Sequence, residues 1–386
     1  MSKVSIVRSG TEGKGVRRSI ELCDGLSAFK SGSKVLIKPN CVIPGSPKKK
    51  PMGTVTNAAV LAEMIEVLKD GGAGPITIGE GTIVIEEIKS STPGCFAWAG
   101  IKEVADNYGV RLQDFNEGPF RKLEFEGHRI KVAESAFEND FFVDLPVLKT
   151  HTQTRISLGA KNLKGCLSAT SRKTFHEQNL EEFIALLNQE IRVDLSLIDG
   201  TYGLQKGPFG EDAIPFNLII AGRDVIATDM VGAEVMGIDY REVLHLKLLA
   251  EYRDHSFDLG DVEIVGEPIE EVRQPLEWWY PWTDELLKAF NIRGLTVKNP
   301  GLVFCSGCTI TVFAGLRSFL KANAGSDFGK AEICIGDAVA EEGSDPVVLL
   351  GKCPMAVNKD RGDAIAVKGC PVSISDVVNG LTKALC

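Results

Sequence analysis

The sequence predicts an α/β protein with a mostly parallel sheet in its N-terminal two thirds and a smaller α/β module at its C-terminal end. Short apolar runs alternate with amphipathic segments of helical period, which is the pattern of a parallel sheet covered on both faces. Glycine and proline residues separate these segments. In addition, six of the ten cysteines lie in the C-terminal quarter, with Cys386 as the final residue, which indicates that this module has a chemistry of its own.

The N-terminal elements follow from the spacing of apolar residues. Thr56 is expected to cap a helix whose apolar residues share one side and which stops at Gly71 and Gly72. The expected order is strands at 4–7 and 34–37, this helix, a strand at 76–78, a helix at 101–108, a hairpin of 123–126 with 128–132, a strand at 140–145, a helix at 180–191, strands at 195–198 and 216–220, a helix at 224–236 and a strand at 260–265.

A connector at 266–298 is expected to separate two domains, at 1–265 and 299–386. Its centre holds Trp278, Trp279 and Trp282, and we interpret it as an amphipathic segment that packs the domains together. A partner-docking or membrane-touching surface is the alternative, although the lysine-rich face of a membrane anchor is missing. The expected C-terminal elements are strands at 301–304, 331–335, 347–350 and 364–367 and helices at 310–320 and 373–385.

Composition and charge exclude several classes of protein. The 386 residues are 44% hydrophobic and 25% charged, as in ordinary globular proteins. No apolar run approaches the roughly 20 residues of a membrane span, and the N-terminus lacks the apolar core of a secretory signal, so a cytoplasmic location is expected. The net charge of −9 argues against nucleic acid as a partner, because phosphate binding needs a basic surface. Whether identical copies associate as a homo-oligomer is left open.

Four cysteines of the C-terminal module have the spacing of metal ligands. Cys305 and Cys308 form a C-x2-C pair, and Cys353 and Cys370 each precede a proline. Three of the four follow closely on expected strand ends, so they are expected to meet at the carboxyl edge of a sheet. One pair and two single cysteines favour a [4Fe-4S] cluster over structural zinc, whose ligands usually form two close pairs. The alternatives are zinc, unligated thiols, or Cys334 in place of one single cysteine.

The segments FCSGCTITV, LLGKCPMAV and VKGCPVSISDVVNGL resemble the three cysteine segments of the [NiFe]-hydrogenase small subunit and of its relatives in respiratory complex I. The resemblance covers about a quarter of the chain and implies a proximal [4Fe-4S] cluster held by these segments. Two positions depart from the pattern. Val372 stands where a second proline is usual, and Pro354 stands where alanine is more common.

Two short N-terminal segments gather cationic and amide side chains at strand ends. The segments VLIKPN and DLPVLKTHTQTRISLGAKNLKGCL contribute Lys38, Asn40, Lys149, His151, Lys161, Asn162 and Lys164. Such groups bind carboxylates, phosphates and cofactor head groups, so a basic cleft for an anionic small molecule or cofactor is expected.

Within this expected cleft the residues take two roles. Lys149, His151 and Lys161 are the catalytic candidates, with His151 as proton carrier, although a hydrogen-bonded structural histidine is equally compatible. The residues expected to hold the anionic partner or cofactor are Lys38, Asn40, Asn162 and Lys164. Whether Cys41 and Cys166, beside these segments, touch a second metal is left open.

Two further segments complete the N-terminal part. The glycine-rich stretch at 199–210 allows close approach of a ligand, but it lacks the Gly-Lys-Ser/Thr ending of a phosphate-binding loop. Asp224 is expected near a helix start, and Asp229 either faces the same cleft or is solvated.

The segments KPN, TNAAVLAEMIEVLKDGGA, LPVLKTHTQTRISLGAKNLKG, DGTYGLQKGPFG and GRDVIATD resemble domain-of-unknown-function family 362, in the expected order over roughly residues 1–250. This family is often joined to iron–sulfur modules, and the resemblance implies an architecture rather than a reaction. More distantly, the Lys-x-His…Lys pattern of Lys149, His151 and Lys161 is similar to that of nickel-dependent lactate racemase.

The expected function is that of an iron–sulfur redox protein of anaerobic metabolism. Its C-terminal cluster would exchange single electrons with an anionic substrate or cofactor in the N-terminal cleft, as in an oxidoreductase. One alternative is an electron-transfer or maturation partner of another redox protein, with no substrate of its own. The other is a lactate-racemase-like isomerase of hydroxy acids in which the cluster is structural.

Overall fold

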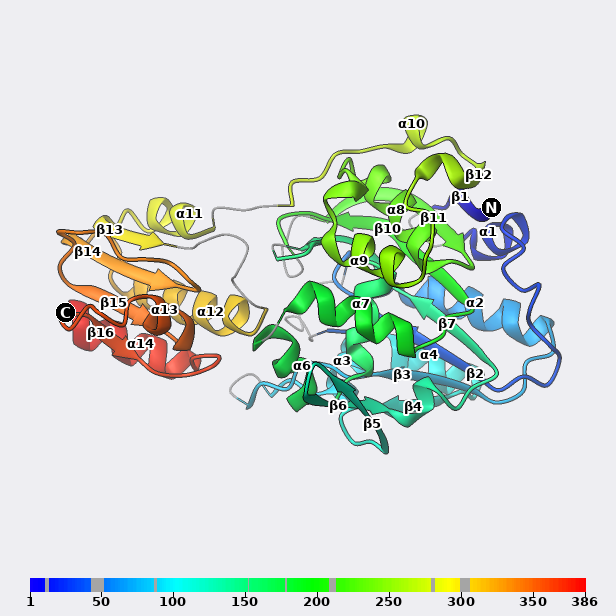
Figure 1. Ribbon diagram of the computed structural model, residues 1–386, viewed down its shortest axis with the longest axis horizontal. Helices are drawn as coiled ribbons and strands as arrows, with labels where there is room; N and C mark the ends of the chain where they lie inside the picture. The colour runs from blue at the N-terminus through cyan, green and yellow to red at the C-terminus, as the bar shows by residue number, and fades with distance from the viewer. Residues whose placement is uncertain are drawn as a thin grey trace. The chain divides into compact units, whose positions relative to one another are not determined.

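The computed structural model describes residues 1–10, 14–42, 52–86, 89–151, 153–177, 179–207, 213–278, 282–298 and 306–386. The chain forms two compact units, Met1–Trp278 and Trp279–Cys386, each of which has its own sheet and core. Figure 1 traces both units. The mixed α/β architecture confirms the predicted fold class.

A large, mostly parallel sheet forms the centre of the N-terminal unit. Its strand order is β12-β1-β11-β10-β7-β2-β3-β4, and β8 pairs with both β10 and β9. Antiparallel pairing is confined to the β1/β11, β10/β11 and β8/β9 contacts of this sheet. The strands are β1 (Ser2–Arg8), β2 (Val35–Pro39), β3 (Ile76–Glu80), β4 (Arg111–Asp114), β7 (Phe141–Leu145), β8 (Val147–His151), β9 (Arg155–Ile156), β10 (Leu195–Leu204), β11 (Ala213–Gly222) and β12 (Val262–Gly266).

Helices cover both faces of this sheet because its strands are apolar on both sides. Val35 and Ile37 of β2 join one core while Leu36 joins the other, as the two-residue period of a strand requires. The first core is closed by α1 (Val16–Leu22), α2 (Ala58–Asp70), α3 (Thr92–Trp98) and α4 (Ile101–Tyr108). The second is closed by α5 (Gly159–Asn162), α6 (Ala169–Glu177), α7 (Leu180–Glu190), α8 (Val225–Val235), α9 (Leu244–Tyr252), α10 (Ile269–Val272) and the hairpin of β5 (Phe120–Phe125) and β6 (His128–Ala133).

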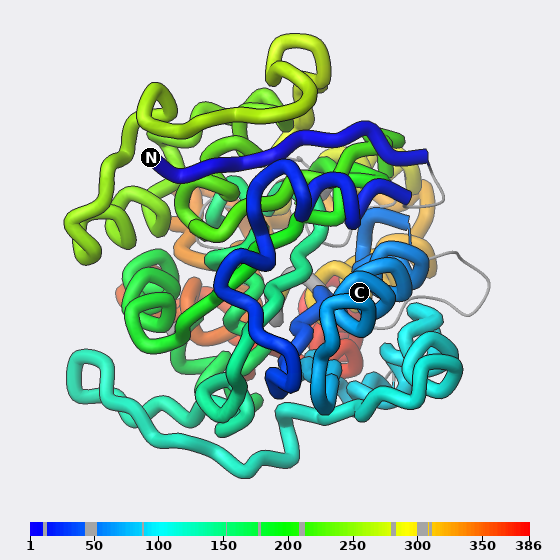
Figure 2. The backbone as a smooth tube through the Cα atoms, turned by 90° about the vertical axis from the view of Figure 1, so that its right-hand side faces the viewer, coloured from blue at the N-terminus to red at the C-terminus, as the bar shows by residue number. Residues whose placement is uncertain are grey.

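The figures show the two layers from different sides. In Figure 1, α7 and α9 lie in front of the sheet. In Figure 2, the blue segments that contain α1 and α2 lie toward the viewer. The helices at 101–108 and 180–191 and the hairpin around Gly127 agree closely with the sequence prediction.

Three local features differ from the prediction. The N-cap of α2 is Asn57, whose side chain accepts the Ala59 N–H, whereas the Thr56 hydroxyl accepts the Asn40 N–H and donates to the Leu145 carbonyl. The glycine-rich stretch after Asp199 continues as strand to Leu204 rather than forming a loop from the start. Strand β8 directly follows Pro146 and keeps the parallel pairing with β10 that β7 begins, while its other neighbour changes from β2 to β9.

The C-terminal unit has a four-stranded, fully parallel sheet in the order β13-β14-β15-β16. Strand β13 lies within the expected connector, and the strand expected at 301–304 falls outside the described residues. The elements are α11 (Trp282–Ala289), β13 (Arg293–Lys298), α12 (Ser306–Ala322), β14 (Asp327–Ile335), β15 (Val347–Leu350), α13 (Lys352–Val357), β16 (Ile365–Val367) and α14 (Ile374–Leu385).

None of the described helices combines the length and the apolar character that crossing a bilayer requires.

Candidate functional site

Polar side chains gather at the carboxyl ends of three neighbouring strands of the N-terminal sheet. Lys38 lies one residue before the end of β2, Glu80 ends β3, and Asp144 lies one residue before the end of β7. The strand order places β2 between the other two. The carboxyl edge of a parallel sheet is where ligand-binding groups usually collect, because the loops that follow the strands meet there.

Lys38 and Glu80 form a buried ion pair. Lys38 Nζ lies 2.9 Å from Glu80 Oε2, and the two residues are 0% and 2% exposed. Glu80 also accepts the main-chain N–H groups of Cys41 and Gly81. A buried charge is tolerated only when it is paired and hydrogen-bonded, and this pair meets both conditions. The Lys38 ammonium is therefore engaged inside the protein.

A chain of amide hydrogen bonds continues from this ion pair. Asn162 Oδ1 accepts from Lys38 Nζ at 3.2 Å and from Asn40 Nδ2 at 2.9 Å, and Asn162 Nδ2 donates to Asp144 Oδ1 at 2.8 Å. Asn40 Oδ1 in turn accepts from Lys149 Nζ at 2.6 Å. We call Lys38, Asn40, Glu80, Asp144, Lys149 and Asn162 the polar network. Burial lowers the pKa of Lys149 to about 8 and raises the pKa of Asp144 well above its usual range.

Beside this network lies a group of five basic side chains. We call Lys149, His151, Lys161, Lys164 and His176 the lysine–histidine cluster. Lys164 Nζ lies 2.8 Å from His176 Nε2, and the positive charges of Lys161, Lys164, His176 and Lys149 all act on His151. Burial, reinforced by these charges, lowers the pKa of His151 and of His176 well below the ordinary histidine value.

His151 is held in one orientation by the main chain. Its Nδ1 accepts the N–H groups of Gln153 at 3.1 Å and Thr154 at 3.3 Å. Since Nδ1 acts as an acceptor, the proton of the neutral ring is on Nε2. This places a donor rather than a basic lone pair at Nε2 in the neutral state.

Lys161 differs from the other buried lysines. It is 9% exposed, and within the described part of the chain its Nζ makes no hydrogen bond or ion pair. Burial, followed by the charges of Lys164 and Lys149, lowers the pKa of Lys161 well below its ordinary value. These surroundings favour the neutral amine over the ammonium ion.

The short helix α5 that carries Lys161 and Asn162 is fixed at its start. Both oxygens of Asp229 accept main-chain N–H groups, from Gly159 and Ala160, each at 2.8 Å. A carboxylate is favoured at a helix start, although burial raises the pKa of Asp229 to about 7. Asn188 Nδ2 donates to the Ala160 carbonyl at 2.8 Å. Asp229 therefore stabilises the helix that carries Lys161 and Asn162.

The residue after Lys164 must be glycine. A Cβ at Gly165 would lie 1.9 Å from Glu80 Oε1 and 2.6 Å from Lys38 Nζ, so any side chain would displace the ion pair. The sequence Leu-Lys-Gly-Cys thus brings the backbone directly onto the Lys38–Glu80 pair.

All seven residues that the sequence singled out for the N-terminal site lie in these two groups. Lys38, Asn40, Asn162 and Lys149 join the polar network, and His151, Lys161 and Lys164 join the lysine–histidine cluster. Asp224 caps α8 by accepting the Ala227 N–H and lies 3.0 Å from His255. Sequence reasoning missed Glu80, Asp144 and His176. A signal for Glu80 was present, since it stands between two glycines at a strand end.

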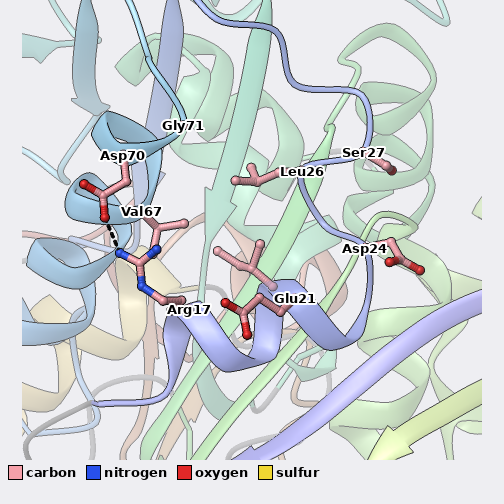
Figure 3. A pocket seen from close by; sticks show the side chains of 9 residues that line it. Arg17, Glu21, Asp24, Leu26, Ser27, Val67, Asp70 and Gly71 are labelled. Atoms are coloured by element: carbon pink, nitrogen blue, oxygen red, sulfur yellow. Dashed lines mark hydrogen bonds and ion pairs between the residues drawn. The ribbon is translucent and has the colours of Figure 1, made fainter.

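Two surface depressions lie elsewhere on the N-terminal unit. One of about 480 Å³ is lined by residues of α1 and α2, among them Arg17, Glu21 and Asp70 (Figure 3). Another of about 450 Å³ surrounds Gly266. Arg17 and Asp70 are half exposed, so their ion pair is screened by water and carries little chemical information. The lysine–histidine cluster is the stronger candidate because its basic groups are largely removed from water and the pKa values of Lys149, His151, Lys161 and His176 are shifted.

Two of the cysteines proposed as ligands, Cys353 and Cys370, closely follow the carboxyl ends of parallel strands. Cys353 is the second residue of α13, directly after β15, and Cys370 lies three residues after β16. Main-chain hydrogen bonds join these two segments, from Gly351 N to the Val367 carbonyl and from Lys352 N to the Gly369 carbonyl. Cys308 lies in the first turn of α12, and Cys305 falls outside the described residues.

The segments of Cys308, Cys353 and Cys370 follow strands of the same parallel sheet in chain order. In the described residues taken alone, no group of three or more His, Cys, Asp or Glu side chains is placed to hold a metal ion. Cys334 is buried beside Glu332, and burial raises the pKa of its thiol to about 12. Its environment is that of a structural thiol.

Together, the fold and these contacts define an α/β protein with a buried basic cluster at the carboxyl edge of a mostly parallel sheet. Residues 35–234 match the family described as Domain of unknown function (DUF362), which is more than half of the chain. The protein belongs to this family, as the sequence motifs predicted.

Two similar proteins add context. A thylakoid-associated protein of Synechocystis sp. is 24% identical over 261 residues, which cover 62% of this chain and 76% of that protein. The structure of the lactate racemase apoprotein from Thermoanaerobacterium thermosaccharolyticum aligns with 100% of this chain and 81% of its own, with a TM-score of 0.44 and 12% identity. Similarity at that level does not establish a common activity.

Proposed function

We propose that the protein is an oxidoreductase that binds a small anionic substrate or cofactor at the lysine–histidine cluster and carries a [4Fe-4S] cluster in its C-terminal unit. The observation that best supports binding of an anion is the enclosure of Lys161 among basic side chains. Buried positive groups normally have a carboxylate beside them, as Lys38 has Glu80. Lys161 makes no ion pair within the described residues, and Glu181, whose negative charge acts on Lys161, lies 2.6 Å from His245 Nδ1 instead. A bound anion would balance the positive charges of Lys149 and Lys164, which act on the Lys161 amine.

The residues of the site have different roles in binding the anion. Lys149, whose pKa is about 8, is mostly protonated at neutral pH and supplies positive charge from the polar network. The amides of Asn40 and Asn162 fix its position through the hydrogen bonds described above. His151, with its proton on Nε2, presents a neutral donor instead of acting as a base. Proton acceptance in this site therefore belongs to Lys161.

The first experiment measures anion binding directly. The full chain is titrated calorimetrically with inorganic phosphate, lactate and pyruvate. Lys149→Met and Lys161→Met should each weaken binding of the preferred anion at least about tenfold, as expected for loss of one charge-assisted hydrogen bond. Lys102→Met, on the exposed side of α4, is the matched control and should leave the Kd unchanged. Failure of all three anions to bind would refute this assignment, as would unchanged affinity in both site variants.

The C-terminal unit would hold the metal cluster with Cys305, Cys308, Cys353 and Cys370. Such a cluster, when bound, supplies or accepts single electrons. The chain's own contribution is to bring the ligand segments to one sheet edge. Main-chain N–H groups of the glycine-rich segments around Cys353 and Cys370 would tune the cluster's potential.

The second experiment tests the metal centre. Anaerobically reconstituted protein should contain about four iron and four acid-labile sulfide per chain and give an EPR signal on reduction. Cys353→Ser and Cys370→Ser should lose most of the iron. Cys334→Ser is the matched control, because Cys334 contacts Glu332 rather than a ligand segment, and it should keep the iron. Colourless protein without iron, or iron loss confined to Cys334→Ser, would contradict the proposal.

A second candidate function is that of an isomerase of hydroxy acids with a structural cluster. The observation that favours it is the low pKa of Lys161, because a neutral amine can remove a proton from a bound acid. The two candidates separate in one comparison. Racemisation of lactate that Lys161→Ala abolishes and Cys353→Ala preserves would establish the isomerase, and dependence of turnover on Cys353 would favour the oxidoreductase.

A further inference from the structure

We propose that Lys161 is a nucleophilic amine that forms an imine with the carbonyl carbon of an anionic oxo compound, of which a 2-oxo acid is the simplest example. This inference rests on the proposed anion site and deepens it by naming the reactive atom and the substrate class. It concerns the organic substrate alone and does not depend on the metal cluster.

Four lysines are buried among the described residues of the N-terminal unit, and they separate into two kinds. Lys38 Nζ donates to Glu80, and Lys149 Nζ donates to Asn40 Oδ1 and to the Thr54 carbonyl. Lys164 Nζ lies beside His176 Nε2. Lys161 Nζ alone contacts no acceptor in the described part of the chain. A nucleophilic amine needs this arrangement, because an acceptor would hold it as an ammonium ion.

The surroundings of Lys161 keep the lone pair of its amine available. Burial disfavours the charged form, and the neighbouring charges of Lys164 and Lys149 disfavour it further. A desolvated lysine beside other cations is a recognised way of activating an amine toward carbonyl compounds. The same neighbouring charges would attract the carboxylate of a 2-oxo acid, which places its carbonyl carbon next to Nζ.

The backbone beneath Lys161 is held firmly enough to position the amine. Asp229 fixes the first two N–H groups of α5, and Asn188 fixes the Ala160 carbonyl one residue before Lys161. Asn162, the next residue, is anchored on both sides by Lys38 and Asp144. Pre-organisation of this kind favours attack, because little conformational freedom is lost when the amine meets its substrate.

The reaction balances without any oxidant or reductant. The Lys161 lone pair forms the new N–C bond while the carbonyl π bond breaks and its oxygen takes a proton. The carbinolamine then loses its hydroxyl group, with one proton from nitrogen, as water, and the N=C bond remains. The carboxylate stays near the basic side chains throughout, so the total charge at the site does not change.

The test traps the imine in the full chain with pyruvate as the probe and cyanoborohydride as the reductant. Intact-mass analysis at pH 7 should show one reduced pyruvate adduct per chain, and peptide mapping should place it on Lys161. Surface lysines react slowly at this pH, because only roughly one in a few thousand is neutral. The adduct should form at least about tenfold faster in wild type than in Lys161→Arg. Lys102→Arg, which changes an exposed lysine, should behave as wild type.

Three outcomes decide the matter. An adduct on Lys161 in wild-type protein establishes the imine even if Lys161→Arg fails to fold. Pyruvate that binds in the calorimeter but gives no adduct refutes the imine and leaves the anion site intact. An adduct spread over surface lysines, at the same rate in Lys161→Arg, also refutes it. Phosphate titration of the wild-type chain reports on the anion site separately, since phosphate has no carbonyl group.

Discussion

At the residue scale, the buried charges of the N-terminal unit show which groups support the fold and which are available for chemistry. Lys38 is fully buried and has an anionic partner, two further acceptors and a fixed place at the end of β2. Lys161 is buried to a similar degree without such partners. We therefore expect the protein to lose stability when the Lys38 ion pair is broken and to gain stability when the Lys161 amine is removed.

Glu80→Ala should be strongly destabilising, by about 3–5 kcal/mol, because it leaves the Lys38 ammonium buried without a counter-charge. Adding Lys38→Met should recover part of this loss. Urea unfolding at neutral pH gives the free energies. Asp106→Ala breaks the exposed pair with Lys102 and should change little. A Glu80→Ala variant as stable as Asp106→Ala would contradict the role assigned to the ion pair.

Lys161→Met should stabilise the protein at neutral pH, by on the order of 1 kcal/mol, because an apolar side chain avoids the cost of enclosing an amine among cations. The folded-state pKa of Lys161 lies below the unfolded value of 10.5, so between these values the folded chain binds fewer protons and its stability rises with pH. The gain from Lys161→Met should accordingly shrink as pH approaches 10.5. Unfolding free energies measured from pH 6 to 10 test this trend, and a constant difference would oppose it.

Sequence reasoning recovered the basic residues of this site but not their partners. Lys38, Lys149 and His151 lie within the last three residues of β2 or β8, and Lys161 lies on the short helix α5 that follows. Their grouping in two short segments is visible in the sequence. Glu80 is 42 residues from Lys38 in the chain, and only the adjacency of β2 and β3 brings them together. His176 lies on a polar helix with no strand-end signal, so nothing local pointed to it.

At the element scale, the turn between α5 and α6 determines the shape of the site. Gly165 lies directly on the Lys38–Glu80 pair, and the segment around it, Leu163–Cys166, carries Lys164 into the cluster. This element has no room for a side chain at position 165.

Gly165→Ala should therefore destabilise the protein, by about 1–3 kcal/mol, and weaken anion binding, since the added methyl group displaces Glu80 or moves Lys164. Thermal unfolding and phosphate titration measure the two effects. Gly362→Ala, at a position where a Cβ meets nothing within 4 Å, is the control and should be neutral. If both alanine variants bind phosphate equally well, the turn does not shape the site.

Helix and strand periods were clear enough in the sequence to place most elements, whereas their ends depended on tertiary contacts. Thr56 was a reasonable cap for α2, but its hydroxyl is used to tie Asn40 to Leu145, and Asn57 caps the helix instead. Strands β10 and β11 run ten residues each, beyond their apolar centres, because they pair with one another along their length.

On the scale of the whole molecule, the two units have separate sheets and separate cores. Their proposed ligands also differ in kind, since one unit offers basic nitrogen atoms and the other offers thiols. A substitution that abolishes binding of one ligand should then leave binding of the other unchanged.

Cys370→Ser should lose iron and keep the wild-type Kd for phosphate, whereas Lys149→Met should bind phosphate more weakly and keep its iron. Iron analysis and calorimetry on the same protein samples provide the comparison. Loss of both properties in either variant would show that the units depend on each other. The separate location of the two ligand sets is the physical reason for the expected independence.

The class of fold was predictable because an alternation of short apolar strands with amphipathic helices has few packed solutions. The order of strands was not predictable in the same way. Strand β1 pairs with β11 and β12, more than two hundred residues away, and no local pattern reports a contact of that range. The cysteines proposed as cluster ligands stood out for the opposite reason, since each carries its own local motif.

The enclosure of the basic cluster has a kinetic consequence for a chain whose net charge is −9. A small anion that approaches from solution first meets a repulsive long-range field and meets attraction only after it has entered the site. Added salt shortens the reach of that field, to about 8 Å at physiological ionic strength. Capture of the anion should accordingly become faster as salt is added, the reverse of what a basic surface patch would show.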